Sequence, residues 1–310
     1  MNKSTAIAID LAKHIFQIAA ENAQREIVWE GRLKSREAMH AFLAKLEPPM
    51  TVAFETGPGA QAWAREIQAR GVEVRILPAQ HTAAHRSGNK NDTRDAHAIL
   101  YALHDVNVHP VPVKTQDQLT LQALHRARQG WRGRMTAIGN QVRGLLLEHA
   151  VVIAQGDAAL VRTTDRALED ATLPIPDRLR ALVAELMGER KGYQERLAVL
   201  DGELATLSRT DPVARHLREV RGIGPITSTA LACKGIHPDQ FADSRQFAAY
   251  FGITPSQHSS GPKIRLGHMS RRGDTYLRSI LIEGAHSVIR QIRSDASDPY
   301  SRRIQRWVKR

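Results

Sequence analysis

Two long heptad patterns in the middle of the chain constrain its fold more than any other feature. The first covers residues 124–149 and the second 179–207. Apolar side chains at alternating spacings of three and four over about four heptads predict long helices with a narrow apolar seam, which is typical of coiled coils. Between them, "LEDATLPIPDR" carries Pro174 and Pro176, which interrupt helices. Residues 113–210 are therefore expected to form an antiparallel helical hairpin.

Two arginines, Arg128 and Arg190, interrupt these apolar seams. A charged side chain at a seam position sets the register of the helices or the choice of partner. We therefore expect a homo-oligomer, a dimer or a tetramer, held together through the coiled coil. The seam positions are Leu124, Arg128, Trp131, Met135, Ile138, Val142, Leu145 and His149, followed by Leu179, Val183, Leu186, Arg190, Tyr193, Leu197, Leu200, Leu204 and Leu207.

The first segment, residues 1–112, alternates strand and helix signals. "TAIAID", "HIFQIAA" and "EIVWEGR" are three consecutive strand patterns, followed by an amphipathic helix over 35–46 with Ser35 as its cap. "TVAFE" predicts a fourth strand, 60–70 a helix, "VEVRIL" a fifth strand and 92–104 a helix. By analogy, this order is that of ribonuclease-H-like folds. We expect an α/β N-terminal domain followed by all-α regions.

Four acids stand at particular places in this predicted sheet. Asp10 ends the first strand and Glu55 the fourth, while Asp92 and Asp95, three residues apart, share one helix face. In a ribonuclease-H-like sheet the first and fourth strands are neighbours and the last helix crosses beside them, so the four carboxylates would converge. Such hard oxygen ligands select Mg²⁺ or Mn²⁺. Two ions about 4 Å apart would support phosphodiester cleavage.

Each acid also has an ordinary structural explanation. Asp10 fits a turn after a strand, Glu55 fits a solvated surface, and Asn91 or Asp92 fits a helix cap with Asp95 in the first turn. These explanations are plausible one by one, but all must hold at once to replace the shared site. We therefore favour a metal site formed by the four acids.

The positive charge of the chain is concentrated near its C-terminus. The net charge is +12, and residues 211–310 carry 17 Lys and Arg against 8 Asp and Glu. Arginine outnumbers lysine 14 to 3 there, which suits bidentate contact with phosphates. A solvated basic surface is the alternative. The scarcity of acids favours a nucleic-acid partner.

Two motifs in the basic third concern nucleic-acid binding. "RGIGPITSTALA" has the form of a helix-hairpin-helix turn, although a structural glycine-rich turn is the alternative. Residues 250–286 then gather Ser256, Ser259, Ser260 and Ser270 among glycines and basic side chains. The residues expected to contact nucleic acid are Arg221, Gly222, Gly224, Lys263, Arg265, Arg271, Arg272 and Arg278.

The remaining composition indicates the compartment. Cys233 is the single cysteine, which excludes an intrachain disulfide, and it fits a small core residue better than a nucleophile. No apolar run approaches the roughly 20 residues that a membrane span needs, and Asp10 and Lys13 break the N-terminal run. We expect a cytoplasmic protein without membrane contact.

Five motifs in this order resemble a known family over nearly the whole chain. They are "AIDLAKHIF", "FETGPGA", "KNDTRDAHAIL", "RGIGPITSTAL" and "YFGITPSQHSSGPKIRLGHMSRRGDTYLRSIL". Together they resemble bacterial insertion-sequence transposases of the DEDD type, the IS-one-ten family with its IS-eleven-eleven subgroup. The order of the motifs carries the resemblance, because none of them is specific alone.

The resemblance implies a domain plan and a site. Residues 1–112 would be a RuvC-like catalytic domain, 113–210 a coiled coil and 211–310 the C-terminal transposase domain. Asp10, Glu55, Asp92 and Asp95 match the four acids of the family. The serine of its Ser-Gly block falls on Ser260, with Ser259 as an adjacent alternative. Family members usually continue beyond the position of Arg310 into another helix, so a short C-terminal helix is expected.

The resemblance also implies a mechanism and partners. Such enzymes move their element as a circular intermediate and use a structured guide RNA to pair donor and target DNA. Acids and serine from different subunits form a composite site with a covalent phosphoserine step. The protein would be associated with the bacterial nucleoid.

Three functions remain open on these residues. The first is a DNA-strand-exchange enzyme. The second is a metal-dependent nuclease that resolves Holliday junctions, which needs the acids but not the serine block. The third is a non-catalytic nucleic-acid-binding remnant of a decayed element. We favour the first, because the acids and the serine block occur together.

Overall fold

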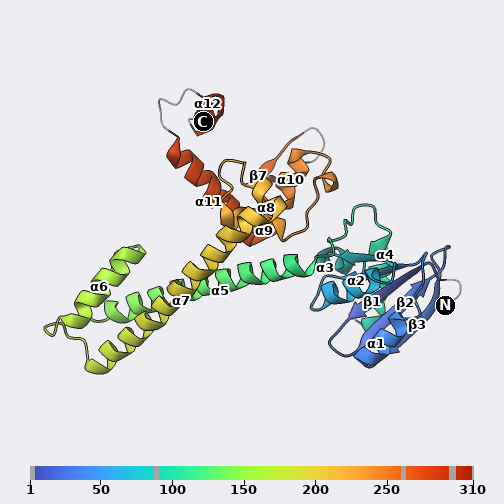
Figure 1. Ribbon diagram of the computed structural model, residues 1–310, viewed down its shortest axis with the longest axis horizontal. Helices are drawn as coiled ribbons and strands as arrows, with labels where there is room; N and C mark the ends of the chain where they lie inside the picture. The colour runs from blue at the N-terminus through green and yellow to red at the C-terminus, as the bar shows by residue number, and fades with distance from the viewer. Residues whose placement is uncertain (1–3, 87–90, 260–262, 293–297, 309–310) are drawn as a thin grey trace. The chain divides into compact units, whose positions relative to one another are not determined.

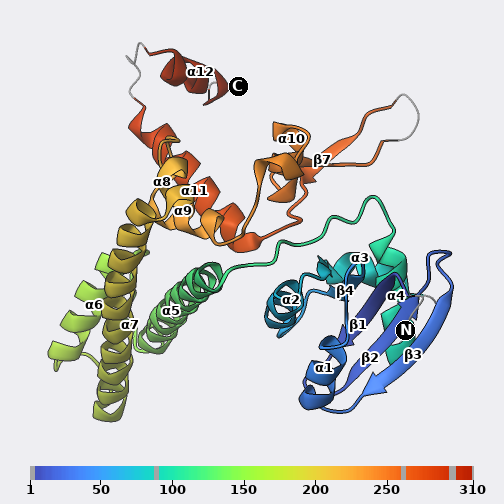
Figure 2. The ribbon, with the colours of Figure 1, turned by 45° about the vertical axis from the view of Figure 1, so that its right-hand side comes forward.

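The protein consists of two compact units, residues 1–115 and 116–310 (Figures 1 and 2). The computed structural model describes residues 4–86, 91–259, 263–292 and 298–308, with only the backbone for 307 and 308. The division within the second unit that the sequence places at residue 210 stays a prediction.

A mixed five-stranded sheet forms the centre of the first unit. Its order is β3 (Ile27–Leu33), β2 (Phe16–Glu21), β1 (Ala6–Leu11), β4 (Thr51–Glu55), β5 (Glu73–Leu77). The first three strands pair antiparallel, whereas β4 runs parallel to both β1 and β5. This confirms the predicted α/β class, and the order is compatible with a RuvC-like domain.

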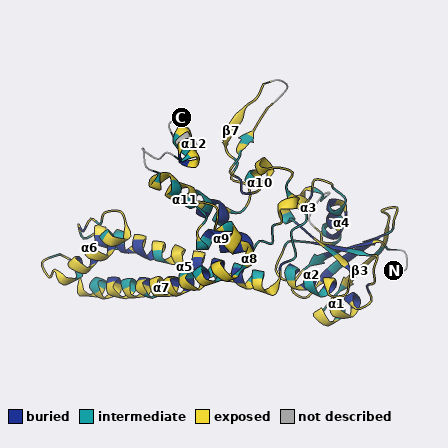
Figure 3. Cartoon of the chain, turned by 45° about the horizontal axis from the view of Figure 1, so that its top comes forward, coloured by how far each residue is buried: buried dark blue, intermediate teal, exposed yellow. Residues whose placement is uncertain are grey.

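The two faces of the sheet carry side chains of different size, and different helices cover them. Ile7 and Ile9 of β1 belong to a core that includes residues of α1 (Arg36–Leu43) and α2 (Ala60–Gln68). Ala6 and Ala8 belong to a second core, with residues of α4 (Asp92–Leu103). Because alanine side chains are small, α4 lies close to this face of the sheet. Figure 3 shows the central strands, β2, β1 and β4, mostly buried.

Local capping explains where two of these helices begin. The Ser35 hydroxyl accepts a hydrogen bond from the Ala38 N–H at 3.1 Å, and the Asn91 side chain accepts one from the Thr93 N–H at 3.1 Å. Ser35 is therefore the predicted cap, and of the two candidates for α4 the cap is Asn91. A short helix that the sequence did not indicate, α3 (Ala79–Ala84), follows β5.

The second unit is built on two long antiparallel helices, α5 (Gln116–Leu147) and α7 (Asp177–Thr210). Val142 and Leu146 of α5 pack near Val183 of α7, while Leu121 packs near Leu204, so the helices run in opposite directions. The helical hairpin is thus confirmed, and its coiled-coil character stays a prediction. An additional helix, α6 (Asp157–Glu169), lies between them in the chain.

The C-terminal part of this unit is mainly helical. Leu231 of α9, Phe251, and Leu277 and Ile280 of α11 form its core. Cys233 is buried among Leu121, Leu200 and Leu204, as expected of a small core residue. The elements are α8 (Pro212–Leu217), α9 (Pro225–Ala232), η1 (Pro238–Gln240), α10 (Ser244–Tyr250), β6 (Pro255–Gln257), β7 (Leu266–Met269), α11 (Thr275–Gln291) and α12 (Pro299–Val308).

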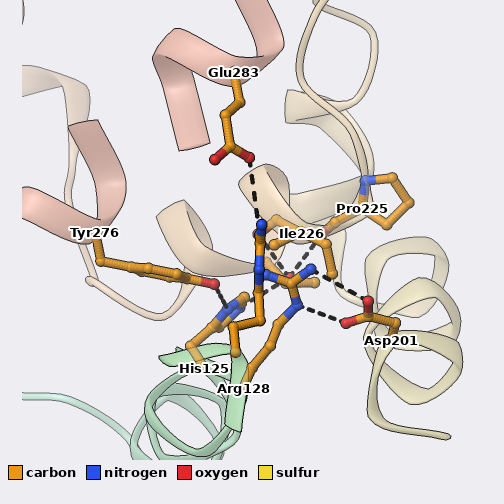
Figure 4. Close-up of polar contacts among 9 residues, drawn as sticks. His125, Arg128, Asp201, Pro225, Ile226, Tyr276 and Glu283 are labelled. Carbon is orange, nitrogen blue, oxygen red and sulfur yellow. Dashed lines mark hydrogen bonds and ion pairs between the residues drawn. The ribbon is translucent and has the colours of Figure 1, made fainter. Parts of the chain in front are cut away.

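A buried polar cluster joins four of these helices (Figure 4). From α5, the Arg128 guanidinium donates to both carboxylate oxygens of Asp201 on α7, at 2.6 and 3.2 Å. One turn earlier, His125 shares hydrogen bonds with the hydroxyls of Tyr276 on α11 at 2.9 Å and Thr229 on α9 at 3.0 Å. The cluster therefore fixes α9 and α11 against the α5–α7 hairpin.

The chemistry of His125 follows from its burial. Desolvation, together with the nearby Arg128 cation, lowers the pKa of His125 to about 4. The ring is therefore neutral at physiological pH, with one nitrogen as donor and the other as acceptor for the two hydroxyls. Burial also raises the pKa of Tyr276, so its phenol keeps its proton.

Both seam arginines find acids within the same chain. Besides the Arg128–Asp201 pair, Nη2 of Arg190 lies 2.8 Å from an Asp157 carboxylate oxygen, which joins α7 to α6. Arg128 therefore joins the two helices of the hairpin, and Arg190 joins α7 to α6, both within one chain. Oligomerisation, which the sequence inferred from these arginines, stays a prediction.

Removing the acid of the Arg128–Asp201 pair should destabilise the second unit. The substitution Asp201→Ala leaves a buried guanidinium without its partner, at a cost of about 1–2 kcal/mol because Asp201 itself is partly exposed. Urea unfolding should show this loss, while Glu203→Ala, an exposed neighbour on α7, changes stability by less than about 0.5 kcal/mol.

The double variant Arg128→Met, Asp201→Ala should recover much of the loss, because an apolar side chain then fills the seam. Equal stability of the Asp201→Ala and Glu203→Ala proteins would show that the pair contributes nothing to the hairpin.

Candidate catalytic and nucleic-acid-binding sites

Strand register aligns two of the four predicted acids. In the parallel pairing of β1 and β4, Ala8 lies opposite Ala53, and Asp10 and Glu55 each follow two residues further along. Residues two apart on a strand share a face. Asp10 and Glu55 therefore lie at the carboxyl ends of neighbouring strands, on the face that α4 covers. Gln17 of β2 lies opposite Asp10.

The two aspartates of α4 occupy its first turn but contact different arginines. Asp95 forms an ion pair with Arg86, which precedes the helix, and its side chain is only 12% exposed. Asp92 forms an ion pair with Arg32 of β3, and both of these side chains are about half exposed. Arg32 lies opposite Gln17, so it extends the row of polar residues across the sheet.

A buried threonine fixes the carboxylate of Glu55. The Thr82 hydroxyl lies 2.9 Å from the Glu55 carboxylate and 3.0 Å from the Ala79 carbonyl oxygen, and Thr82 is almost fully buried on α3. The sequence did not single out Thr82, because α3 itself was not predicted. His81 also lies on α3, and His85 pairs with Asp105 at 3.1 Å.

The donor chemistry of this region suits a hard cation. Carboxylate oxygens are what Mg²⁺ and Mn²⁺ prefer, and Asp95 Oδ1 is a buried oxygen without a well-aligned hydrogen bond. Across residues 4–86 and 91–115, however, no three His, Cys, Asp or Glu side chains stand close enough to hold an ion. The strand register thus places Asp10 and Glu55 at the ends of neighbouring strands, whereas Asp92 and Asp95 pair with arginines, and convergence of the four acids stays a prediction.

Of the serine block, Ser256 lies on β6 and Ser259 follows this strand. Ser260 lies outside the described residues. The neighbouring Ser259 hydroxyl accepts hydrogen bonds from the Gln257 amide at 3.0 Å and from the Arg265 N–H at 3.1 Å. Lys263 and Arg265, which precede β7 in the chain, are exposed.

A tight turn presents the next two arginines, Arg271 and Arg272, to solvent. Arg271 has a φ of 54°, and a Cβ on Gly252 would lie 1.8 Å from the Arg272 carbonyl oxygen, so only glycine fits there. The buried Arg278 guanidinium donates to the carbonyl oxygens of Phe251, Arg271 and Arg272 at 3.0–3.3 Å. Arg278 therefore positions the turn, whereas the sequence suggested a direct nucleic-acid contact.

The glycine-rich turn before α9 has a structural reason at one of its glycines. Gly222 has a φ of 89°, and a Cβ there would lie 3.1 Å from the Gly284 carbonyl oxygen of α11. Gly224 is the N-cap residue of α9, with open space around it. The Arg221 guanidinium stacks 5.0 Å from the ring centroid of Tyr300. A helix-hairpin-helix role in DNA binding stays a prediction.

Comparison with known proteins decides the family. A family model described as "Transposase IS116/IS110/IS902 family" matches residues 214–301, and a DEDD transposase model of the IS110 type matches residues 7–151. A "Probable family 20 transposase" from Pseudomonas aeruginosa is 36% identical over 98% of this chain and 89% of its own length. The chain belongs to the IS110 family of DEDD transposases.

Further relatives of the transposase agree with this membership. A Yersinia enterocolitica protein, "Transposase for insertion sequence element IS1328", is 32% identical over 99% of this chain and 89% of its own. The Coxiella burnetii "Transposase for insertion sequence element IS1111A" is 28% identical over 93% of this chain and 79% of its own. Among the described residues of the transposase, no helix has the length and apolarity to cross a membrane.

Two arginines of the transposase should respond differently to mutation. Arg272→Ala removes an exposed cation, so the log–log salt slope of DNA binding should fall by about 0.9 if one phosphate contact is lost, with little change in stability. Arg278→Met should leave the slope unchanged but lower stability by about 1–3 kcal/mol, because buried carbonyls lose their donor.

Fluorescence anisotropy of labelled DNA over a salt series, with urea unfolding of each variant, separates these effects. If Arg278→Met reduced the salt slope of DNA binding as much as Arg272→Ala does, Arg278 would have to contact a phosphate directly.

Proposed function

We propose that this transposase cleaves and rejoins DNA strands to move its insertion sequence, using a metal-bound acidic site and a nucleophilic serine. The observation that supports this most is the placement of Asp10 and Glu55 at the ends of adjacent parallel strands. The first turn of α4, with Asp92 and Asp95, belongs to the helix on that same face. Family membership makes DNA the substrate class.

The finer architecture follows the same proposal. The 3-2-1-4-5 strand order supports a RuvC-like catalytic domain, and the long α5–α7 hairpin supports a coiled coil through which subunits assemble. The basic third, with Lys263, Arg265, Arg271 and Arg272 exposed, supports binding of DNA and of a structured guide RNA.

Asp10, Glu55, Asp92 and Asp95 would hold one or two Mg²⁺ or Mn²⁺ ions. When bound, these ions would activate the attacking oxygen and stabilise the leaving oxygen. The protein contributes the orientation of the ligands. Thr82 holds the Glu55 carboxylate, and the helix start at Asn91 fixes the two aspartates in one turn.

Ser260 is the proposed nucleophile. Its oxygen would form a bond to phosphorus as the strand's P–O bond breaks, giving a phosphoserine ester and a free strand hydroxyl. Lys263 and Arg265 are close in sequence and exposed, which suits neutralisation of phosphate charge. A Holliday-junction nuclease would use the acids alone, and a binding remnant would use neither group.

Substitution of the acids tests the metal site, because it should remove cleavage and leave DNA binding in place. Asp10→Asn, Glu55→Gln and Asp95→Asn should each abolish Mg²⁺-dependent strand cleavage while DNA affinity stays within about twofold, because the basic C-terminal part carries affinity. Cleavage assays and binding titrations on the same duplex provide the measurement. Near-normal cleavage by any of the three would exclude a shared metal site, and cleavage by wild type excludes the binding remnant.

The serine is tested by trapping the covalent step. Wild type on a nicked suicide substrate should give a protein–DNA adduct that resists denaturation, and Ser260→Ala should not, while Ser256→Ala keeps it. Loss of the adduct in Ser259→Ala but not in Ser260→Ala moves the nucleophile by one residue. Intact cleavage with no adduct in any protein would favour the nuclease.

A further inference from the structure

A polar cavity of about 390 Å³ lies between α5, the end of α9 and the start of α11 in the second unit. Its wall includes Gln122, Arg126 and Gln129 on the α5 side, and Lys234, Asp274 and Tyr276 on the other side. Arg126 and Gln129 are exposed, so the cavity is open to solvent. A cavity of this size accommodates a small organic group. It belongs neither to the acidic site nor to the serine block.

The helix α5 supplies three long polar side chains to this cavity. Gln122, Arg126 and Gln129 follow one another at spacings of four and three residues, so they lie along one face of the helix. Within the part of the chain that the structure describes, none of the three forms a side-chain hydrogen bond or an ion pair. A glutamine amide offers both donors and an acceptor, whereas a guanidinium offers donors alone. These groups are therefore available to a ligand.

Contacts within the protein hold the opposite wall in place. The Lys234 ammonium forms an ion pair with the Asp274 carboxylate, so these two charges neutralise each other. The Tyr276 hydroxyl shares a hydrogen bond with His125 at 2.9 Å, which fixes the aromatic ring beside the cavity (Figure 4). A wall that is already ordered loses little conformational freedom when a ligand binds.

The charge distribution favours a polyanion that passes the mouth of the cavity. Residues 118–147 contain five arginines and no lysine, aspartate or glutamate. In the cavity itself, Arg126 and Lys234 are positive, Asp274 is negative and His125 is neutral, which leaves a single net positive charge. One exposed cation suits one phosphate group, and the neutralised interior suits an uncharged group attached to it.

A nucleobase has the chemistry that this interior can recognise. Base edges present donors and acceptors side by side, and a side-chain amide such as that of Gln122 or Gln129 can bond to them in pairs. The flat face of a base stacks on an aromatic ring such as that of Tyr276. Proteins recognise the unpaired bases of single strands through this combination of stacking and hydrogen bonds to the edge.

We propose that this cavity binds one unpaired nucleotide of the nucleic acid that the transposase holds. Arg126 contacts its phosphate, Gln122 and Gln129 bond to the edge of its base, and Tyr276 contacts the face of the base. The inference rests on the nucleic-acid binding of the proposed function, and neither on its metal site nor on its serine. The unpaired nucleotide can come from an opened DNA strand or from a structured RNA. The helix α5 then recognises nucleic acid as well as forming the hairpin.

The experiment measures binding of the full chain to fluorescent duplexes by anisotropy, in the presence of a chelator so that no strand is cut. One duplex is fully paired, the second contains one bulged adenosine, and the third contains one bulged abasic site, which adds the same backbone without a base. Wild type should bind the adenosine bulge about tenfold more tightly than the abasic bulge, because one base adds stacking and edge contacts. The three duplexes are made in DNA and again in RNA, and the preference identifies the source of the nucleotide.

Substitutions in the wall should remove this preference. Gln122→Leu, Gln129→Leu and Tyr276→Leu should each reduce it to less than about threefold, while affinity for the paired duplex stays within about twofold of wild type. Tyr276→Phe keeps the ring and should keep most of the preference. Arg126→Ala should lower the log–log salt slope for the adenosine bulge by about 0.9, because one phosphate contact is lost.

Gln141→Leu is the matched control. It makes the same change at an exposed position of α5 that lies about three turns beyond Gln129 and outside the cavity wall, and it should keep the full preference. Because each preference is a ratio measured on one protein, a loss of folded protein lowers both affinities alike and does not imitate the loss of the base contacts.

The outcomes separate this inference from the function on which it rests. Equal affinity of wild type for the adenosine and abasic bulges, in DNA and in RNA alike, would overturn the nucleotide site and leave nucleic-acid binding standing. A preference that survives Gln122→Leu, Gln129→Leu and Tyr276→Leu would place the base elsewhere and overturn the site as well. Absence of binding to every duplex would overturn nucleic-acid binding itself and the inference with it.

Discussion

The pairing of Arg128 with Asp201, and the histidine beside it, is the interaction on which the helical unit depends. Two helices of more than 30 residues can slide past each other along an apolar seam at little cost, because leucines are interchangeable contacts. A buried guanidinium with one acid at one position removes that freedom. Since His125 joins the same cluster to α9 and α11, the placement of the C-terminal core follows from the register of the hairpin.

In the sheet domain the controlling feature is the alternation of side-chain size along β1. The isoleucines of this strand support α1 and α2, and its alanines admit α4. The period of two places Asp10 on the alanine side, so the carboxylate faces the helix that carries Asp92 and Asp95. The location of the acids is thus a consequence of how the domain packs.

The sequence could predict this much because periodicity and strand-end acids are local signals. The five strands, the long helices, the Ser35 cap and the burial of Cys233 all follow from patterns within about 30 residues. The helix α3 and the pairing of Arg86 with Asp95 could not be predicted in this way. The helix α3 is short and follows directly after Pro78. The Arg86–Asp95 pair joins residues whose geometry depends on how α3 and α4 meet.

Arg278 is a second case that the sequence alone could not predict. An arginine in a basic region is easily taken for a phosphate ligand until its burial is known. Three of its acceptors are main-chain carbonyls, which every amino acid possesses, and Thr275 supplies a hydroxyl as well. The shape of the turn at 271–272 is therefore largely independent of which side chains it displays. Replacement of Arg272 would therefore change the side chain that this turn displays to solvent without removing the hydrogen bonds that hold its backbone.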